Sequence, residues 1–95
     1  MTVQEKIHEY LSVHRDEMVE DIKTLIKVDS ARAEALPGKP YGEGAAEALL
    51  AGLSLFEKHG FLGKNWDNYA IDTVINGKEL GLDILAHLDV VPGGD

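Results

Sequence analysis

The sequence predicts an α/β fold in which two N-terminal helices are followed by a β-hairpin. Two segments, 2–26 and 43–59, carry apolar residues at three- and four-residue steps, which is the spacing of an amphipathic helix. The next segment, 69–89, contains two strand-like runs around Asn76-Gly77, the dipeptide most typical of a tight hairpin turn. A chain of 95 residues is long enough for at most one small domain.

The composition argues against several classes of protein. With 9 basic and 17 acidic side chains, the formal net charge of −8 disfavours nucleic acid and anionic membranes as partners. Because cysteine is absent, thiolate zinc sites and cysteine nucleophiles are excluded, and a metal would need His, Asp or Glu ligands. We find no targeting signal and no apolar run near the ~18 residues of a membrane span. The expectation is therefore a cytoplasmic protein.

The first segment is expected to form one long helix with a buried apolar stripe. Thr2 followed by Glu5 is the pattern of a capping box, which satisfies free backbone donors at a helix start. Three of the histidines, His8, His14 and His59, match no motif and are interpreted as structural or surface residues. The stripe consists of Val3, Ile7, Leu11, His14, Met18, Ile22, Leu25 and Ile26.

Residues 27–43 form a connector that is rich in helix breakers. Loops of this length are often functional, so Lys39 and Tyr41 are candidates for contact with a substrate. A simple surface crossing between two helices explains the same residues equally well.

The second helix and the strands end at recognisable turns. Gly60 can take a positive φ angle, and Phe61 can then pack back on the helix in a Schellman motif. The first strand is expected over 69–75 and the return strand over 80–89. Because 84–88 is apolar on nearly both faces, we expect a strand that is covered on two sides. With one neighbour only, such a strand has an open edge through which the chain could self-associate.

The chemically informative residues are His87 and Asp89, at the end of this second strand. Strand side chains alternate, so both are expected on one face, about 7 Å apart along the strand. Sites of open α/β sheets gather at the carboxyl ends of strands. An imidazole is a good zinc ligand, and its second nitrogen is usually held by a carboxylate or a carbonyl. The pair could therefore supply a ligand and the group that orients it.

His-x-Asp alone is a weak motif, because a hydrogen-bonded pair that closes a strand has the same pattern. Burial favours a site, since two buried polar groups must both be satisfied, at roughly 1–3 kcal/mol for each failure. The prediction thus depends on an inward-facing pair.

The longer string His87–Asp95, HLDVVPGGD, resembles the first metal motif of the dinuclear-zinc dipeptidase and amidohydrolase family. This family includes Xaa-His dipeptidases, carnosinases and aminoacylases. Three upstream strings look like its bacterial dipeptidase branch: Lys39–Gly44, Gly60-Phe61 and Lys64–Ala70. The resemblance covers almost the whole chain and implies the start of an α/β/α catalytic domain.

The resemblance assigns His87 as a ligand of one zinc ion and Asp89 as the catalytic-site carboxylate that orients it. It implies two zinc ions in the complete enzyme, of which one ligand is present here, and a small dipeptide as substrate. The other ligands and a glutamate general base have no counterpart in residues 1–86. Residues 1–95 are therefore expected to be the N-terminal part of a catalytic domain, ending inside the motif loop and inactive alone.

Two other functions stay open at this point. An N-acyl amino acid amidohydrolase shares the same His-x-Asp string, so it is the nearest competitor to a dipeptidase. A non-catalytic acidic interaction module, which would recruit a partner or a second copy through the open strand edge, belongs to a different class.

Overall fold

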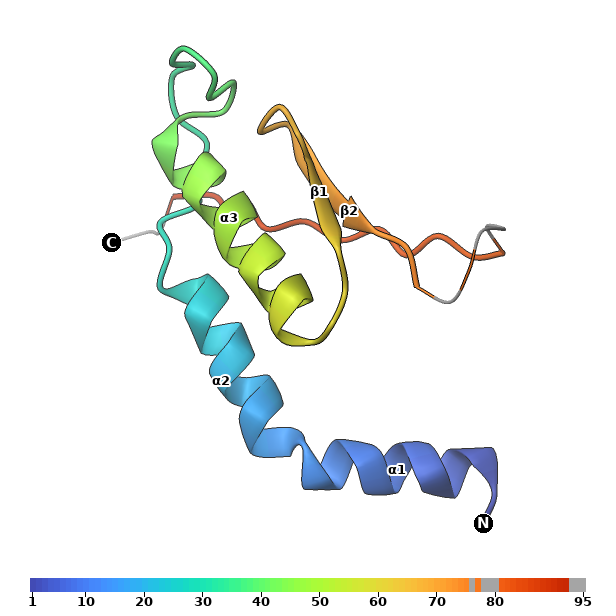
Figure 1. Cartoon of the computed structure of the whole chain (residues 1–95). Coiled ribbons are helices and arrows are strands. Elements are labelled where there is room, and N and C mark those ends of the chain that lie inside the picture. The colour runs from blue at the N-terminus through green and yellow to red at the C-terminus, as the bar shows by residue number, and fades with distance from the viewer. Residues whose placement is uncertain (76, 78–80, 93–95) are drawn as a thin grey trace.

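The computed structural model describes residues 1–75, 77 and 81–92, and in them it has three helices and one antiparallel hairpin (Figure 1). The hairpin and α2 both pack on α3, while α1 projects away from the rest of the chain. The predicted α/β fold class is confirmed. In chain order the elements are α1 (Val3–Val13), α2 (Arg15–Ile26), α3 (Glu43–Lys58), β1 (Gly63–Trp66) and β2 (Ala70–Thr73).

The prediction of one long helix over 2–26 is wrong, because the helix is divided at His14. The backbone of His14 leaves the helical path, with φ −99° and ψ 10°. Two residues earlier, the Ser12 hydroxyl donates a hydrogen bond to the His8 carbonyl at 2.8 Å, a local bond that often bends helices. The Thr2 half of the predicted capping box forms, since Thr2 Oγ1 accepts a hydrogen bond from the Glu5 amide at 3.1 Å.

The apolar stripe of this segment is mostly exposed, contrary to the prediction, and only His14 and Leu25 of its residues are half-buried. Neither α1 nor α2 has a buried residue. The reason is that, among the described elements, α1 contacts α2 alone, and α2 packs on α3 (Figure 1). An apolar stripe predicts which face of a helix could be covered, but the covering surface must come from another element.

Helix α3 is the centre of the packing and matches the prediction closely. Its buried residues, Ala46, Ala48 and Gly52, are small, so other segments can approach it closely. Its C-terminal end is the predicted Schellman motif. Gly60 has φ +86°, its amide donates to the Glu57 carbonyl at 3.0 Å, and the next amide, of Phe61, donates to the Phe56 carbonyl at 2.8 Å.

The hairpin lies earlier in the chain than predicted. β1 pairs with β2, with Gly63 opposite Thr73 and Trp66 opposite Ala70. Asp67 and Asn68, which connect the strands, both have positive φ, as a type I′ turn requires. Part of the predicted first strand is therefore confirmed, but it pairs with the segment before it.

The predicted return strand over 80–89 does not form in its described part, 81–89. Asn76 and Leu80, which belonged to the predicted turn and strand, lie outside the described residues. The segment crosses behind α3 in Figure 1, and Leu85 is 94% exposed rather than covered on two sides. A strand needs a neighbour to supply hydrogen bonds. Near this segment, the described residues show one parallel bridge, between Ala31 and Val90, which follows the predicted strand.

Within the described ranges, no helix combines the length and the apolar character needed to cross a membrane.

Candidate functional site

The segment that carries His87 and Asp89 is anchored by Ser30. The Ser30 hydroxyl donates a hydrogen bond to the Leu88 carbonyl at 2.7 Å, and the Val90 amide donates to the Ser30 carbonyl at 3.5 Å. Ser30 is only 3% exposed, so its hydroxyl bond is protected from water. The contact joins residues 58 positions apart and fixes the site segment beside the loop after α2.

A close approach of two backbones allows Ser30 to reach this position. A Cβ atom on Gly44 would overlap the carbonyl oxygen of Asp29. Glycine at this point therefore lets the chain before Ser30 lie against the first turn of α3. On the other side of the site segment, the Leu88 side chain faces Gly52 of α3.

The structure brings His87 and Asp89 together. The Nδ1 atom of His87 lies 3.1 Å from the main-chain carbonyl oxygen of Asp89, and 3.4 Å from the carboxylate oxygen Oδ1 of the same residue. A carbonyl oxygen can only accept, so this hydrogen bond requires the ring proton on Nδ1. Nε2 is then the nitrogen with the free lone pair.

The expectation that this pair faces inward is wrong for the chain as described. The His87 side chain is 84% exposed and that of Asp89 is 66% exposed. The cause is the missing strand: without covering layers, the end of the segment lies at the surface. The argument from buried polar groups therefore falls away, and the metal role of His87 stays a prediction that rests on the geometry of the pair.

The pair lines an open pocket of about 440 Å³. Residues of the connector, of the hairpin and of α3 form its other walls. The Arg32 guanidinium lies 5.3 Å from the centre of the Tyr41 ring, and this ring meets Tyr69 edge-on at 5.7 Å. Of the two connector candidates, Tyr41 thus lies in the same pocket as His87. Lys39 lines a neighbouring hollow instead, and its amine is 3.8 Å from Glu43.

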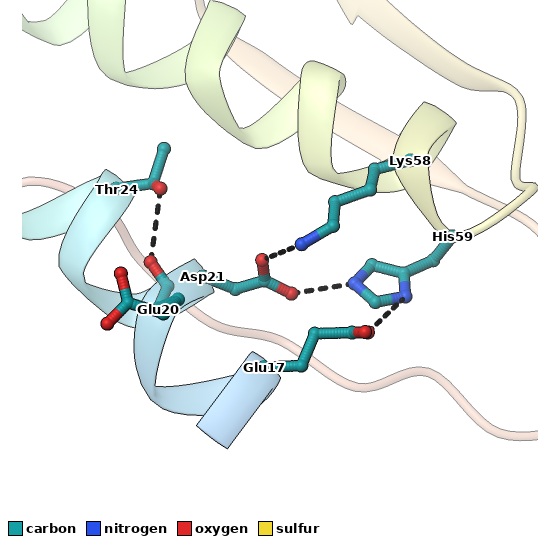
Figure 2. A network of polar contacts seen from close by, with 6 residues as sticks. All are labelled: Glu17, Glu20, Asp21, Thr24, Lys58 and His59. Atoms are coloured by element: carbon teal, nitrogen blue, oxygen red, sulfur yellow. Dashed lines mark hydrogen bonds and ion pairs between the residues drawn. The ribbon is translucent and has the colours of Figure 1, made fainter. Parts of the chain in front are cut away.

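A second polar cluster joins α2 to the end of α3 (Figure 2). The Asp21 carboxylate receives Lys58 Nζ on one oxygen, and its other oxygen lies 2.7 Å from Nε2 of His59. The opposite ring nitrogen of His59, Nδ1, is 3.8 Å from Glu17. His59 thus contacts two acidic side chains of α2 from the end of α3.

The cluster has a clear electrostatic signature. The hydrogen bond from Lys58, and then that from His59, lower the pKa of Asp21 below its ordinary value. Conversely, the hydrogen bond to Asp21 raises the pKa of Lys58. Both shifts favour the charged forms, so the contact acts as an ion pair between the two helices.

Glu17, Asp21 and His59 are also a group that could hold a metal ion, since their ligand atoms lie within 4.8 Å of one another. The observed contacts oppose this use. The two carboxylates lie at opposite nitrogens of the imidazole, and the Lys58 amine already neutralises Asp21 (Figure 2). The sequence signal was the i, i+4 spacing of Glu17 and Asp21, but nothing local indicates that His59 meets them.

Comparison with known proteins finds relatives of this chain that are named dipeptidases. YtjP of Bacillus subtilis (strain 168), provisionally named a dipeptidase, is 36% identical over 83 residues, which are 85% of this chain and 18% of that protein. The β-Ala-Xaa dipeptidase of Lactobacillus delbrueckii subsp. lactis is 32% identical over 89 residues, which are 92% of this chain and 19% of that protein. A provisionally named dipeptidase of Staphylococcus epidermidis is 36% identical over 94 residues, 97% of this chain and 19% of its own length.

No family model matches the chain, and no solved structure matches it significantly. The chain spans about a fifth of the length of the curated relatives that it matches. The aligned residues are 32–36% identical, and they make up 85–97% of this chain. The chain is therefore homologous to the dipeptidase family over a segment that makes up 18–19% of these relatives.

Proposed function

We propose that the chain forms part of the active site of a zinc-dependent dipeptidase, with His87 as a metal ligand and Asp89 as the residue that orients it. The observation that supports this best is the hydrogen bond from Nδ1 of His87 to the Asp89 carbonyl. Metal-ligating histidines typically donate their second ring N–H to a carbonyl or a carboxylate, which fixes the tautomer and the ring direction. Here both kinds of oxygen lie next to Nδ1.

The donor chemistry of this pair fits zinc but supplies only part of a catalytic site. Imidazole nitrogen is a common zinc ligand, and a catalytic zinc has about three protein ligands and an open position. In the described part of the chain, no further His, Asp or Glu joins His87 and Asp89 in a group of three. The remaining ligands, the second metal ion and the general base would then belong to other parts of a protein as long as the relatives.

The residues of this chain would hold and orient the reacting groups. A bound zinc ion supplies a water of lowered pKa and polarises the carbonyl that is attacked. His87 would bind through Nε2, and Asp89 would keep the imidazole in the required tautomer. Arg32 is the only Lys or Arg side chain among the described residues that line the pocket, so it would meet the carboxylate of a dipeptide.

A free-amino dipeptide suits this pocket by size and by charge. A volume of about 440 Å³ is within the usual range for small-ligand sites, roughly 300–1,000 Å³. Tyr41 and Tyr69 add aromatic side chains to its lining. The resemblance of the upstream strings to the bacterial dipeptidase branch, and the name of the Lactobacillus relative, point to the same substrate class.

The deciding experiment measures hydrolysis by the complete gene product that contains residues 1–95. Free-amino dipeptides are compared with N-acyl amino acids, which an amidohydrolase of the same family would prefer. We expect dipeptide hydrolysis that is lost in His87→Ala and only reduced in Asp89→Asn, which removes the carboxylate 3.4 Å from Nδ1 but keeps the main-chain acceptor. The matched control is His8→Ala, on the exposed face of α1, which should retain full activity. Activity on N-acyl amino acids alone would contradict the proposed substrate, and an active His87→Ala variant would contradict the proposed site.

A further inference from the structure

We propose that Ser30 is a positioning residue for this site. It makes hydrogen bonds to the peptide units on both sides of Asp89, and these bonds set the tautomer and the direction of the His87 ring. The proposal rests on the proposed role of His87 as a metal ligand. Ser30 lies in the loop after α2, far from the site in sequence, and it does not line the pocket.

The first hydrogen bond is made by the Ser30 hydroxyl. It donates to the Leu88 carbonyl at 2.7 Å, the usual length of a good O–H···O hydrogen bond. The peptide unit is planar, so fixing this carbonyl also fixes the amide nitrogen of Asp89 in the same plane. With Ser30 3% exposed, water cannot easily replace this donor, and the Leu88 carbonyl depends on the serine side chain.

The second hydrogen bond is made by the Ser30 carbonyl, which accepts from the Val90 amide at 3.5 Å. This amide belongs to the same planar unit as the Asp89 carbonyl. In a trans peptide the N–H and C=O groups point in opposite directions. Turning the Val90 N–H toward Ser30 therefore turns the Asp89 carbonyl away from Ser30, and this carbonyl is the acceptor for Nδ1 of His87.

A consequence follows for the exposed imidazole. His87 has little packing of its own, so its direction depends on the main-chain acceptor beside it. If Ser30 only stabilised the fold, its loss would lower stability without changing the tautomer of His87. If it positions the Asp89 carbonyl, its loss frees the ring to exchange between tautomers, as an exposed histidine does.

The experiment uses ¹⁵N NMR of the ring nitrogens in the labelled 95-residue chain, at a pH above the histidine titration range, followed by titration with zinc chloride. In the unmodified chain we expect the Nδ1–H tautomer to dominate at His87, with His8 on α1 as an internal reference for a free ring. In Ser30→Ala the His87 shifts should move toward those of His8. The zinc response at His87 should become about threefold to tenfold weaker, as expected from the loss of one ordinary hydrogen bond.

The matched control is Thr73→Val, which removes another hydroxyl-to-carbonyl hydrogen bond, from Thr73 to Leu62 at 2.8 Å, in the hairpin. It should leave the His87 tautomer and the zinc response unchanged. If Ser30→Ala loses the amide signals of β1 and β2, a second variant is used. Val90→Pro removes the hydrogen bond from the Val90 amide while Ser30 stays, and it should produce the same tautomer change.

Two failures are distinguishable. A His87 ring that keeps its wild-type shifts and zinc response in Ser30→Ala, or in Val90→Pro where that variant is needed, overturns the role of Ser30. A zinc response that survives His87→Ala contradicts the proposed ligand instead, whatever Ser30 does.

Discussion

The Nε2 atom of His59 lies 2.7 Å from Oδ2 of Asp21, and this contact ties the end of α3 to α2 across 38 residues of sequence. Lys58 binds the other oxygen of the same carboxylate, so two consecutive residues of one helix end converge on a single acid (Figure 2). Since α2 has no buried residue, this polar contact is a main attachment of α2 to the rest of the chain.

We expect stability to depend on pH through this ion pair. The folded-state pKa of Asp21 is lowered, mainly by the hydrogen bond from Lys58, so its stabilisation is present above the ordinary carboxyl pKa near 4 and is lost as the pH falls through the lowered value. The pKa of Lys58 is raised, so its part is present below the ordinary amine pKa and is lost as the pH rises through the raised value. Thermal unfolding should therefore show a plateau in Tm between these ranges.

The matched test compares Asp21→Asn with Asp16→Asn, an acid on the same helix for which the described structure shows no such pairing. Asp21→Asn should lower Tm at neutral pH and flatten the acid limb of the profile. An acid limb that is equally steep in both variants would show that other groups cause it.

Zinc binding by the isolated chain should be weak. One imidazole and one orienting carboxylate fall short of the three protein ligands of a catalytic site, so we expect a Kd weaker than about 1 μM. Calorimetric titration of the unmodified chain, His87→Ala and His59→Ala separates the two histidine sites. Sub-micromolar binding lost in His87→Ala would mean that further ligands lie within the chain. Binding lost only in His59→Ala would place the metal between α2 and α3.

Gly44→Ala should destabilise the chain although alanine is the better helix former. A Cβ atom here overlaps the Asp29 carbonyl oxygen, which is main chain and cannot rotate away. We expect a decrease of about 1–3 kcal/mol in the free energy of unfolding by denaturant titration, as for other overpacked sites. Gly81→Ala is the control, because a Cβ atom there meets nothing within 4 Å. An unchanged stability in Gly44→Ala would mean that the loop before Ser30 does not lie against α3 in solution.

Self-association should involve the exposed apolar segment before the site. Leu82, Ile84 and Leu85 are 81%, 85% and 94% exposed, so this short segment offers three large apolar side chains to a partner. Sedimentation velocity should show larger species as the concentration rises, and Leu85→Lys should reduce them. Leu62→Lys changes an equally exposed but isolated leucine and should have less effect. A stable, monodisperse dimer would instead favour the interaction module over the enzyme.

The features that could be predicted from the sequence depend on short-range interactions. The Thr2 cap and the Schellman motif at Gly60 involve partners three to five residues away, so the local pattern determines them. The proximity of His87 and Asp89 follows in the same way from their separation by two residues.

The features that were missed depend on segments far apart in the chain. Burial of the first apolar stripe and formation of the return strand each need a covering surface that periodicity does not supply. The position of the hairpin, which lies earlier in the chain than predicted, also depends on pairing between segments. Asp67 and Asn68 take positive φ angles of the kind expected at Asn76-Gly77, and β2 pairs with β1, the strand before this turn. Ser30 and His59 gave no local signal, because their partners lie 58 and 38 positions away.

The Ser30–Leu88 hydrogen bond has a consequence for the order of folding. Closing a loop of 58 residues costs conformational entropy that α3 and the hairpin, with their local contacts, do not incur. We therefore expect α3 and the hairpin to assemble first and the His87 side chain to reach its place last. Native-state hydrogen exchange would detect this order as an opening at Val90 that needs less free energy than opening in β2. His87 and Asp89 would then lie in the part of the chain that opens most readily. A bound ligand or a neighbouring surface would therefore stabilise this part more than the rest of the chain.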